Sequence, residues 1–370
     1  MKILHTVQLY DPLKGGSEEV VKQISERLAA RGHEVVVATA RSSRRTFSSL
    51  NGVTVEEFNL SGNEVFGIKG DPNPYREFVK SWDGDLMLNY GAGVWSTDIL
   101  LDHLSELTFR KLLVPCGYWG LGDPRFASYY RTLPSRIENY DSLIYMSKNY
   151  QDYHFDKQNG LEHKAVVIPN GAAEDEFSTN PFSFRKRYEI KTPFMVLTVS
   201  NHHKAKGHRH LIRAMRGIGD ATLVIVGEPA LPDRPWIGCY ARCKAVSAVS
   251  GKVMALRGVP RQDVIAAYKD ADLFALGSEV ECAPLVIYES MAAGTPFVST
   301  RCGNVADNEE HGVVVDHPSQ LGATISSLLL DPTRRKQLGE SGHRAWLESY
   351  TWEKITDRYE GLYAQLAGQK

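Results

Sequence analysis

Short apolar runs alternate with amphipathic stretches along the whole chain, and this alternation is the feature that most restricts its fold. Between the first two runs, Val20, Val21, Ile24 and Leu28 recur at helical spacing. Strands that alternate with helices predict parallel sheets with helices on both faces. The runs that predict strands in the first half are residues 2–10, 34–40, 53–60, 85–90, 111–117, 142–147 and 164–169.

A polar stretch at residues 173–192 interrupts this pattern, which then resumes. A chain of 370 residues is too long for one ordinary core and suits two domains. We therefore predict two doubly wound, Rossmann-like α/β domains that face a cleft, over residues 1–172 and 193–352, joined by the linker 173–192. The predicted strands of the second domain are residues 194–200, 221–227, 252–258, 272–278 and 296–300.

The charge balance and the apolar segments restrict the partners. Lys+Arg 43 against Asp+Glu 44 leaves a net charge of −1, so we expect no nucleic-acid partner. No segment approaches the roughly 20 apolar residues that cross a bilayer, and the start resembles no signal peptide, so we expect a cytoplasmic protein. Arg41, Arg44 and Arg45 leave open a peripheral contact with the inner face of the membrane.

The five cysteines are scattered, which is typical of reduced thiols. Cys239 and Cys243 could share a helix face, but no His or Cys near them in the sequence completes a zinc set. We therefore expect no metal site and no cofactor.

The segment "NHHKAKGHRH" (201–210) follows a predicted strand and leads into a helix. Gly207 would let backbone amides approach an anion, and Lys206 adds a full charge beside a positive helix end. A solvated basic loop is the alternative. Metal binding is disfavoured because the adjacent His202 and His203 point to opposite sides and no carboxylate accompanies them.

The segment "SEVECAPLVIYESMAAGTPFV" (278–298) carries two carboxylates around a predicted helix start. Glu281 lies in the loop, Glu289 lies in the helix, and the amides near Leu285 and Val286 are free for a phosphate. Carboxylates accept hydrogen bonds from hydroxyl groups, so this combination suits a sugar nucleotide. Two solvated glutamates on a surface helix are the alternative.

Several segments resemble a known family. "ECAPLVIYES" has the Glu–seven residues–Glu spacing of retaining glycosyltransferases with the two-domain GT-B fold, and "MAAGTPFVST" resembles glycosyltransferase family 4. "GGSEEVVKQISERLAARGHEVVVAT", "KAKGHRHLIRAM", "RGVPRQDVIAAYKDADLFALGS" and "YTWEKITDRYEGLY" are similar to other parts of that family in the same order. The resemblance implies that a carboxyl-terminal helix, residues 353–370, packs back on the first domain.

The resemblance also implies roles for single residues. Glu289 would bind the ribose of the donor, Glu281 the transferred sugar and Lys206 the diphosphate, so Glu281 and Lys206 are the expected catalytic residues. The expected donor-binding residues are Gly15, Gly16, Asn201, Lys206, Gly207, Val259, Glu281, Ala283, Leu285, Val286 and Glu289.

The chain departs from the family pattern at two positions. Asn201 stands where many members have an arginine, and Cys116, in "VPCGYWG", stands where many have a histidine. The loop around Cys116 is the candidate acceptor or sugar pocket, formed by Cys116, Gly117, Tyr118 and Asn170, although its aromatic residues also suit a core.

The sequence therefore predicts a metal-independent, retaining hexosyltransferase that uses a nucleoside diphosphate sugar and a saccharide or lipid-linked acceptor. The motifs specify neither the base and sugar of the donor nor the acceptor. A nucleotide-dependent dehydrogenase is one alternative, but no GxGxxG follows the first strand. A non-catalytic two-domain sugar-binding protein is the other.

Overall fold

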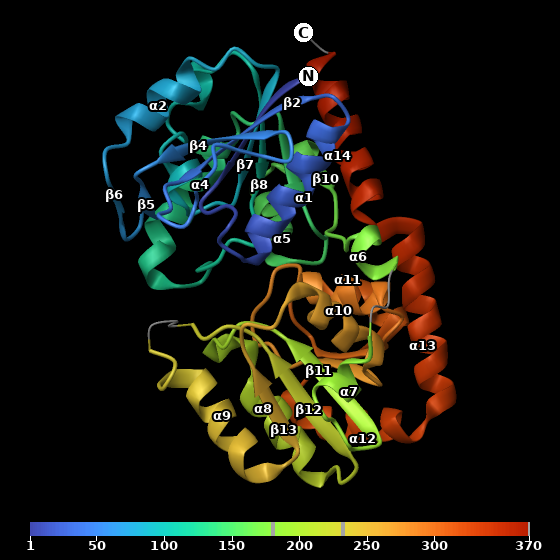
Figure 1. Cartoon of the computed structure of the whole chain (residues 1–370). Helices are drawn as coiled ribbons and strands as arrows, with labels where there is room; N and C mark the ends of the chain where they lie inside the picture. Colours follow the sequence, from blue (N-terminus) through green and yellow to red (C-terminus); the bar gives the residue numbers. More distant parts are fainter. Residues whose placement is uncertain (179–181, 231–233, 369–370) are drawn as a thin grey trace. The chain divides into compact units, whose positions relative to one another are not determined.

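A computed structural model of the chain describes residues 1–178, 182–230 and 234–368. The chain forms two compact units, which are shown in Figure 1. The first unit contains Met1–Pro169 and Trp352–Lys370, and the second contains Asn170–Thr351. Among the described residues, no helix combines the length and apolarity needed to cross a membrane.

The first unit is built on a sheet in which all neighbouring strands are parallel except β3 and β4. The chain runs outward from β1 in both directions, so the switch point of this sheet lies between β1 and β7. A separate antiparallel pair joins β5 (Ser61–Asn63) and β6 (Gly67–Lys69). In spatial order, the strands of the sheet are β10 (Ala165–Val167), β9 (Ser142–Tyr145), β8 (Arg110–Val114), β7 (Leu86–Tyr90), β1 (Lys2–Val7), β2 (Glu34–Ala40), β4 (Val53–Phe58) and β3 (Ser49–Leu50).

Helices pack against this sheet, and one of them comes from the end of the chain. Buried His5 of β1 lies 2.7 Å from Ser25 Oγ through Nδ1 and 3.0 Å from Tyr363 OH through Nε2. These contacts join β1, α1 and α14, so the closing helix is part of the core of the first unit. Residues 369 and 370, the end of the predicted closing helix, lie outside the described residues. The helices are α1 (Gly16–Ala30), α2 (Asn73–Lys80), α3 (Trp95–Asp98), α4 (Ala127–Ile137), α5 (Gln151–Gln158) and α14 (Trp352–Ala367).

The second unit has a fully parallel sheet. The first strand, β11, lies beside both β12 and β14, so the chain changes direction between β11 and β14. The apolar run that forms β16 was not among the predicted strands, because it is short and follows a polar segment. The spatial order is β13 (Val253–Leu256), β12 (Ala221–Val226), β11 (Phe194–Val199), β14 (Leu273–Leu276), β15 (Phe297–Thr300) and β16 (Gly312–Val315).

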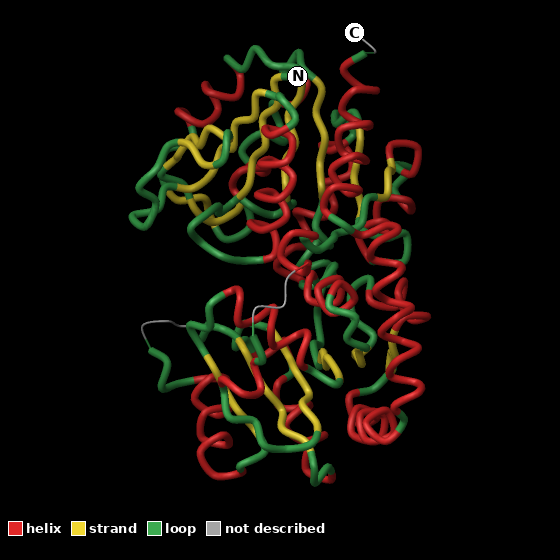
Figure 2. Tube along the Cα trace, turned by 45° about the vertical axis from the view of Figure 1, so that its right-hand side comes forward, coloured by secondary structure: helices red, strands yellow, loops and turns green. Residues whose placement is uncertain are grey.

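Figure 2 shows the helices of each unit around its strands. Residues 173–192, predicted as a linker, lie in the second unit, and residues 179–181 of this stretch are outside the described part. Phe177 and Phe184 are buried in the core of the second unit, and Arg185 pairs with Asp272. The helices of this unit are α6 (Glu174–Ser178), α7 (Phe184–Arg187), α8 (His208–Ala214), α9 (Gly238–Ser250), α10 (Arg261–Asp270), α11 (Leu285–Ala292), α12 (Leu321–Leu330) and α13 (Pro332–Ala345).

Candidate active site

The candidate site lies at the switch point of the second sheet. The carboxyl ends of the neighbouring strands β11 and β14 lead into the loops 200–207 and 277–284. In open parallel sheets, ligands bind beyond the carboxyl ends of the strands at such a point. Both segments that the sequence singled out therefore lie at this edge of the second sheet.

Gly207 allows the two loops to approach one another closely. It has a left-handed backbone (φ 65°), and a Cβ atom added to it would lie 1.7 Å from the carbonyl oxygen of Gly277. The amide of Glu279 also donates a hydrogen bond of 2.7 Å to the carbonyl of Ala205. Because only glycine fits this contact, the turn that carries Lys206 is fixed against the loop that carries Glu281.

Lys206 and Glu281 form an ion pair across these loops. Lys206 Nζ lies 2.8 Å from both carboxylate oxygens of Glu281. The exposed fractions of the two side chains are 31% and 11%, so the pair is sheltered but open to solvent on the lysine side. The two residues expected to be catalytic therefore lie side by side, although 75 positions separate them in the chain.

The loop that carries Glu281 forms hydrogen bonds with β15 and with the turn that follows β15. Thr300 Oγ1 donates a hydrogen bond of 2.6 Å to the carbonyl of Ser278. The amide of Asn304 donates one of 2.8 Å to the carbonyl of Cys282. These two bonds fix the backbone of the loop on both sides of Glu281.

Helix α11 begins directly after this loop. Its N-cap residue is Pro284, no side chain caps it, and its first turn contains no acidic residue. The amides of Leu285 and Val286 are therefore at an uncapped, positive helix end that suits an anion.

Glu289, in the body of α11, is mostly buried and has partners of its own. Arg261 Nη2 lies 2.6 Å from Glu289 Oε1, and the Tyr268 hydroxyl donates a 2.8 Å hydrogen bond to Oε2. Burial, followed by the charge of Glu289, raises the pKa of Tyr268 well above its usual value, so the hydroxyl stays a donor. Arg261 also pairs with Glu176 at 2.5 Å.

No hydrogen bond or ion pair joins Glu289 to Lys206 or Glu281 within the described residues. Arg261 and Tyr268 were not predicted from the sequence. Their spacing of two helical turns on α10, which places both on one face, was the available signal.

Asn201 and the loop of Val259, both predicted to bind the donor, are connected through Glu228. The amide of Glu228 donates to Asn201 Oδ1 at 3.2 Å, and Glu228 Oε1 accepts from the amide of Gly258 at 2.7 Å. Asn201 is thereby linked to the loop of Gly258 and half-buried Val259.

Asn170, which was predicted for the acceptor or sugar pocket with Cys116, Gly117 and Tyr118, lies in the second unit, whereas those three residues lie in the first. Its Nδ2 donates a 3.0 Å hydrogen bond to the carbonyl of Ala283, a predicted donor-binding residue. The predicted first domain ends at residue 172, and the first unit ends at Pro169.

In the first unit, Gly15 and Gly16 lie at the start of α1. Gly15 is the N-cap with an extended backbone, and no side chain caps the helix. A Cβ at Gly15 would lie 2.2 Å from Glu18 Oε2, and Ser17 Oγ donates to the same oxygen at 3.0 Å. Burial raises the pKa of Glu18. The carboxyl group of Glu18 therefore lies against Gly15, whereas nothing lies within 4 Å of a Cβ added to Gly16.

The loop at Cys116 has an unusual backbone. Cys116, Gly117 and Tyr118 all have positive φ, at 58°, 88° and 47°. The amide of Gly117 donates to Asp152 Oδ2 at 2.8 Å, which holds the loop in this conformation. Left-handed residues other than glycine are strained and concentrate at functional sites.

Tyr118 is fully buried, so its ring belongs to the core, which is the alternative that the sequence left open. Its hydroxyl donates to Asp156 Oδ2 at 2.7 Å, and Tyr145 donates to the same oxygen at 2.6 Å. Burial raises the pKa of Asp156 to about 7.

The expected basic surface at residues 41–45 is smaller than predicted. Arg41 and Arg44 are exposed, but Arg45 is buried and pairs with Glu57. Its guanidinium also donates to the carbonyls of Asp11 and Tyr10 at 2.7 and 3.0 Å. Arg45 is therefore structural, because its donors are used within the fold.

A second cluster lies beside the Lys206 turn. The fold brings His202, His208, Cys239 and Cys243 together, with their ligand atoms within 4.8 Å of one another. The argument that nothing completes a zinc set around the two cysteines is therefore wrong, because it considered only their neighbours in the sequence.

Comparisons with known proteins fit this geometry. Residues 180–345 match the family described as Glycosyl transferases group 1. This segment is a glycosyltransferase domain. The GDP-mannose-dependent alpha-(1-6)-phosphatidylinositol monomannoside mannosyltransferase of Mycolicibacterium smegmatis is 27% identical over 241 residues, which cover 60% of this chain and 62% of that relative. The match thus spans less than two thirds of the relative's length.

Solved structures extend the likeness to the whole chain. Sucrose-phosphate synthase from Thermosynechococcus elongatus has a TM-score of 0.81 at 20% identity, over 100% of both chains. HepE from Anabaena, in complex with UDP-glucose, has a TM-score of 0.78 at 17% identity, over 99% of this chain and 100% of HepE. The predicted fold class and the predicted enzyme class, a glycosyltransferase, are confirmed.

Proposed function

We propose that the glycosyltransferase moves a hexose-type sugar from a nucleoside diphosphate sugar to a hydroxyl group of a saccharide or lipid-linked acceptor, with retention of configuration. The observation that carries this proposal is the Lys206–Glu281 ion pair at the switch point of the second sheet. The names of the compared proteins support a nucleotide-sugar donor, since one uses GDP-mannose and another binds UDP-glucose.

Lys206 and the start of α11 would hold the diphosphate. The lysine supplies a full charge, and the uncapped amides at Leu285 and Val286 supply partial positive charge. As the bond to the sugar breaks, negative charge grows on the departing diphosphate, and these fixed groups stabilise it. No divalent cation is then needed at the diphosphate.

Glu281 would accept hydrogen bonds from hydroxyl groups of the transferred sugar. Its carboxylate already pairs with Lys206, so a bound phosphate and a bound sugar would share the two ends of one charged pair. We assign Glu281 to positioning, with the acceptor attacking on the face from which the diphosphate leaves.

Glu289 would bind the ribose hydroxyls of the donor. Arg261 and Tyr268 hold its two oxygens in place, which gives the ribose a fixed acceptor. Asn201, Gly207, Val259 and Ala283 would complete the donor side.

The reaction would take place in the cytoplasm, which the free thiols of all five cysteines support. Exposed Arg41 and Arg44 would contribute weakly to contact with a membrane that carries a lipid-linked acceptor.

The test is release of nucleoside diphosphate from a panel of UDP-, GDP- and ADP-sugars, with and without saccharide and lipid-linked acceptors. We expect one donor class to be used, with release accelerated by an acceptor and unchanged when Mg²⁺ and Mn²⁺ are omitted. The anomeric configuration of the product, measured by NMR, should match that of the donor. Absence of binding and release across the panel would contradict the proposal.

A further inference from the structure

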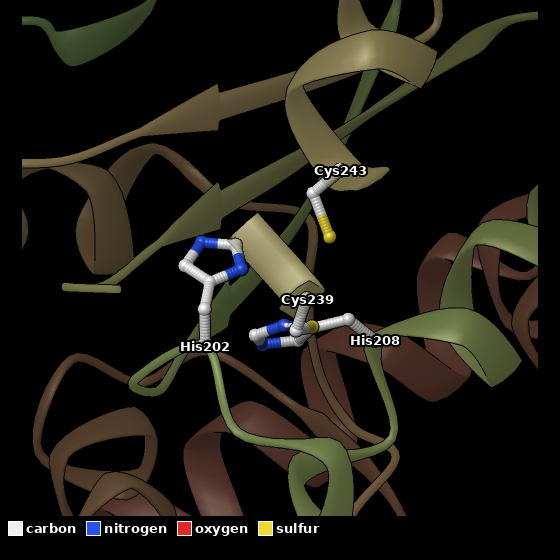
Figure 3. Close-up of side chains that lie close together, drawn as sticks. All are labelled: His202, His208, Cys239 and Cys243. Carbon is white, nitrogen blue, oxygen red and sulfur yellow. Dashed lines mark hydrogen bonds between the residues drawn. The ribbon is translucent and has the colours of Figure 1, made fainter. Parts of the chain in front are cut away.

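Four side chains that could bind a metal ion face one another in the second unit. They come from the loop after β11, the start of α8 and the first half of α9. Figure 3 shows His202, His208, Cys239 and Cys243 turned toward a common space. Their ligand atoms all lie within 4.8 Å of one another. A tetrahedral ion with bonds of about 2.0–2.3 Å brings such atoms to within roughly 3.3–3.8 Å, so small inward movements would close the shell.

Three members of the cluster are buried, Cys239 is half-buried, and the ring of His202 has no hydrogen-bond partner outside the cluster in the described part of the chain. His202 and His208 are each 1% exposed, and Cys243 is 2% exposed. Among the described residues, no group outside these four side chains forms a hydrogen bond with either ring nitrogen of His202. Buried polar groups in native structures are paired with few exceptions, and an unpaired one calls for an explanation such as an ion.

His208 is oriented as a metal ligand would be. Its Nδ1 lies 3.3 Å from Cys239 Sγ, while its Nε2 lies 2.8 Å from Ser200 Oγ. When Nε2 carries the proton and donates to Ser200, the lone pair of Nδ1 faces the cluster. Such a second partner fixes the tautomer and the ring orientation of metal-bound histidines.

The two cysteines lie one helical turn apart on α9, so both sulfurs project from the same face. Both thiols are free in the structure. The helix thus holds one half of the ligand set rigidly, and the loop around Lys206 supplies the other half.

We propose that these four side chains bind one zinc ion in a tetrahedral site with two nitrogen and two sulfur ligands. This donor set is typical of structural zinc. The protein fills all four positions, so the ion would have no open position for substrate.

The site would anchor the turn that binds the donor. His202 and His208 flank Lys206 and Gly207 on both sides, so the ion would tie both ends of the turn to α9. Only this consequence rests on the proposed function; the metal site itself does not.

The first experiment measures metal content by mass spectrometry in the full chain, purified without a histidine tag from zinc-supplemented medium. We expect about one zinc ion per chain. His202→Ala and Cys243→Ser should lose the ion. The matched controls His203→Ala, an exposed neighbour in the same loop, and Cys116→Ser, in the first unit, should retain it.

The second experiment removes the ion from the wild-type protein with a chelator and adds Co²⁺, so it does not depend on the folding of a variant. We expect tetrahedral d–d absorption with a thiolate charge-transfer band. Ser200→Ala should retain the spectrum but weaken zinc affinity about 10–100-fold, because it loses only the partner of His208.

Folded wild-type protein that lacks zinc and gives no such cobalt spectrum would overturn the proposal, as would a Cys239–Cys243 disulfide in the freshly purified protein. Neither measurement uses a sugar donor. A failure of the metal proposal is therefore distinct from a failure of the proposed transfer reaction.

Discussion

The two units share a parallel sheet with a switch point, but they use the charged groups near their loops in different ways. In the second unit, Lys206 and Glu281 form a pair that is partly open to solvent. In the first unit, Asp98 and Asp156 are buried and bound to tyrosines, with Tyr129 donating to Asp98 at 2.8 Å. Burial raises the pKa of Asp98 to about 6 and that of Asp156 to about 7.

This difference distinguishes charged groups that stabilise the fold from charged groups that can bind a ligand. Asp98 and Asp156 each accept hydrogen bonds from tyrosines of the first unit, so these two carboxyl groups join elements of the fold. A partly exposed lysine on a turn that glycine fixes can exchange its carboxylate partner for a phosphate. Residue type alone therefore does not identify a site, and the partners of each charge do.

The largest expected effect is on catalysis by the second unit. Lys206→Ala and Glu281→Ala should each lower kcat/KM about 1,000-fold, or about 4 kcal/mol, because each removes a group that stabilises or positions the transition state. Release of nucleoside diphosphate measures this. Lys336→Ala, which removes an exposed lysine from α13, is the matched control. Near-normal turnover in a folded Lys206 or Glu281 variant would contradict the proposed mechanism.

Gly207→Ala should lower the free energy of unfolding by about 3 kcal/mol. The left-handed backbone costs about 1–2 kcal/mol for alanine, and the clash with the Gly277 carbonyl adds roughly 1–3 kcal/mol. Gly251→Ala is the matched control, since Gly251 has a similar φ of 61° and nothing within 4 Å of an added Cβ. Equal losses in urea unfolding would show that the close approach of the two loops does not matter.

His5 gives the first unit a pH dependence. Burial lowers the pKa of His5 to about 3, against about 6.5 in the unfolded chain. As the pH falls below about 6.5, His5 binds a proton in the unfolded state but not in the folded state, so the free energy of unfolding decreases. Between pH 7 and 5 we expect a loss of about 2 kcal/mol that His5→Gln does not show.

Asp98 and Asp156, whose raised pKa values act in the opposite direction, are present in both proteins and cancel in the difference. Identical pH slopes for wild type and His5→Gln would contradict the assignment.

The smallest expected effect concerns the strained loop of the first unit. Cys116→Gly and Cys116→Ala both remove the thiol, but only glycine relieves the φ of 58°. The glycine variant should be more stable than the alanine variant by about 1 kcal/mol. Thermal unfolding of the pair measures this, and a more stable alanine variant would argue that the left-handed backbone is not retained.

The sequence predicted the two sheets and singled out the loops of Lys206 and Glu281, because both depend on local patterns, but it did not predict the ion pair between these residues. Alternating apolar runs specify parallel sheets, and loops at their carboxyl ends meet at one edge whatever lies between them. The partners of Glu289 and the four-residue cluster depend on how α9 and α10 pack against other elements. No short spacing in the chain records that packing, so Arg261, Tyr268 and the joining of His202 to Cys239 were missed.

Buried polar side chains were the other source of error. Arg45 and Tyr118 are typical of a basic surface and an aromatic sugar platform. Each is instead enclosed, because internal carbonyl or carboxylate groups accept its hydrogen bonds. Such acceptors cannot be read from residue type.

The return of α14 to the first sheet has a consequence for how the protein can be divided. The chain passes into the second unit at Asn170 and leaves it at Thr351, and Ala172 and Thr351 form a parallel bridge. The two ends of the second unit therefore lie next to each other. Removal of α14, by contrast, would take away the Tyr363 hydroxyl that contacts His5. A truncation of this helix would therefore destabilise β1, the first strand of the chain.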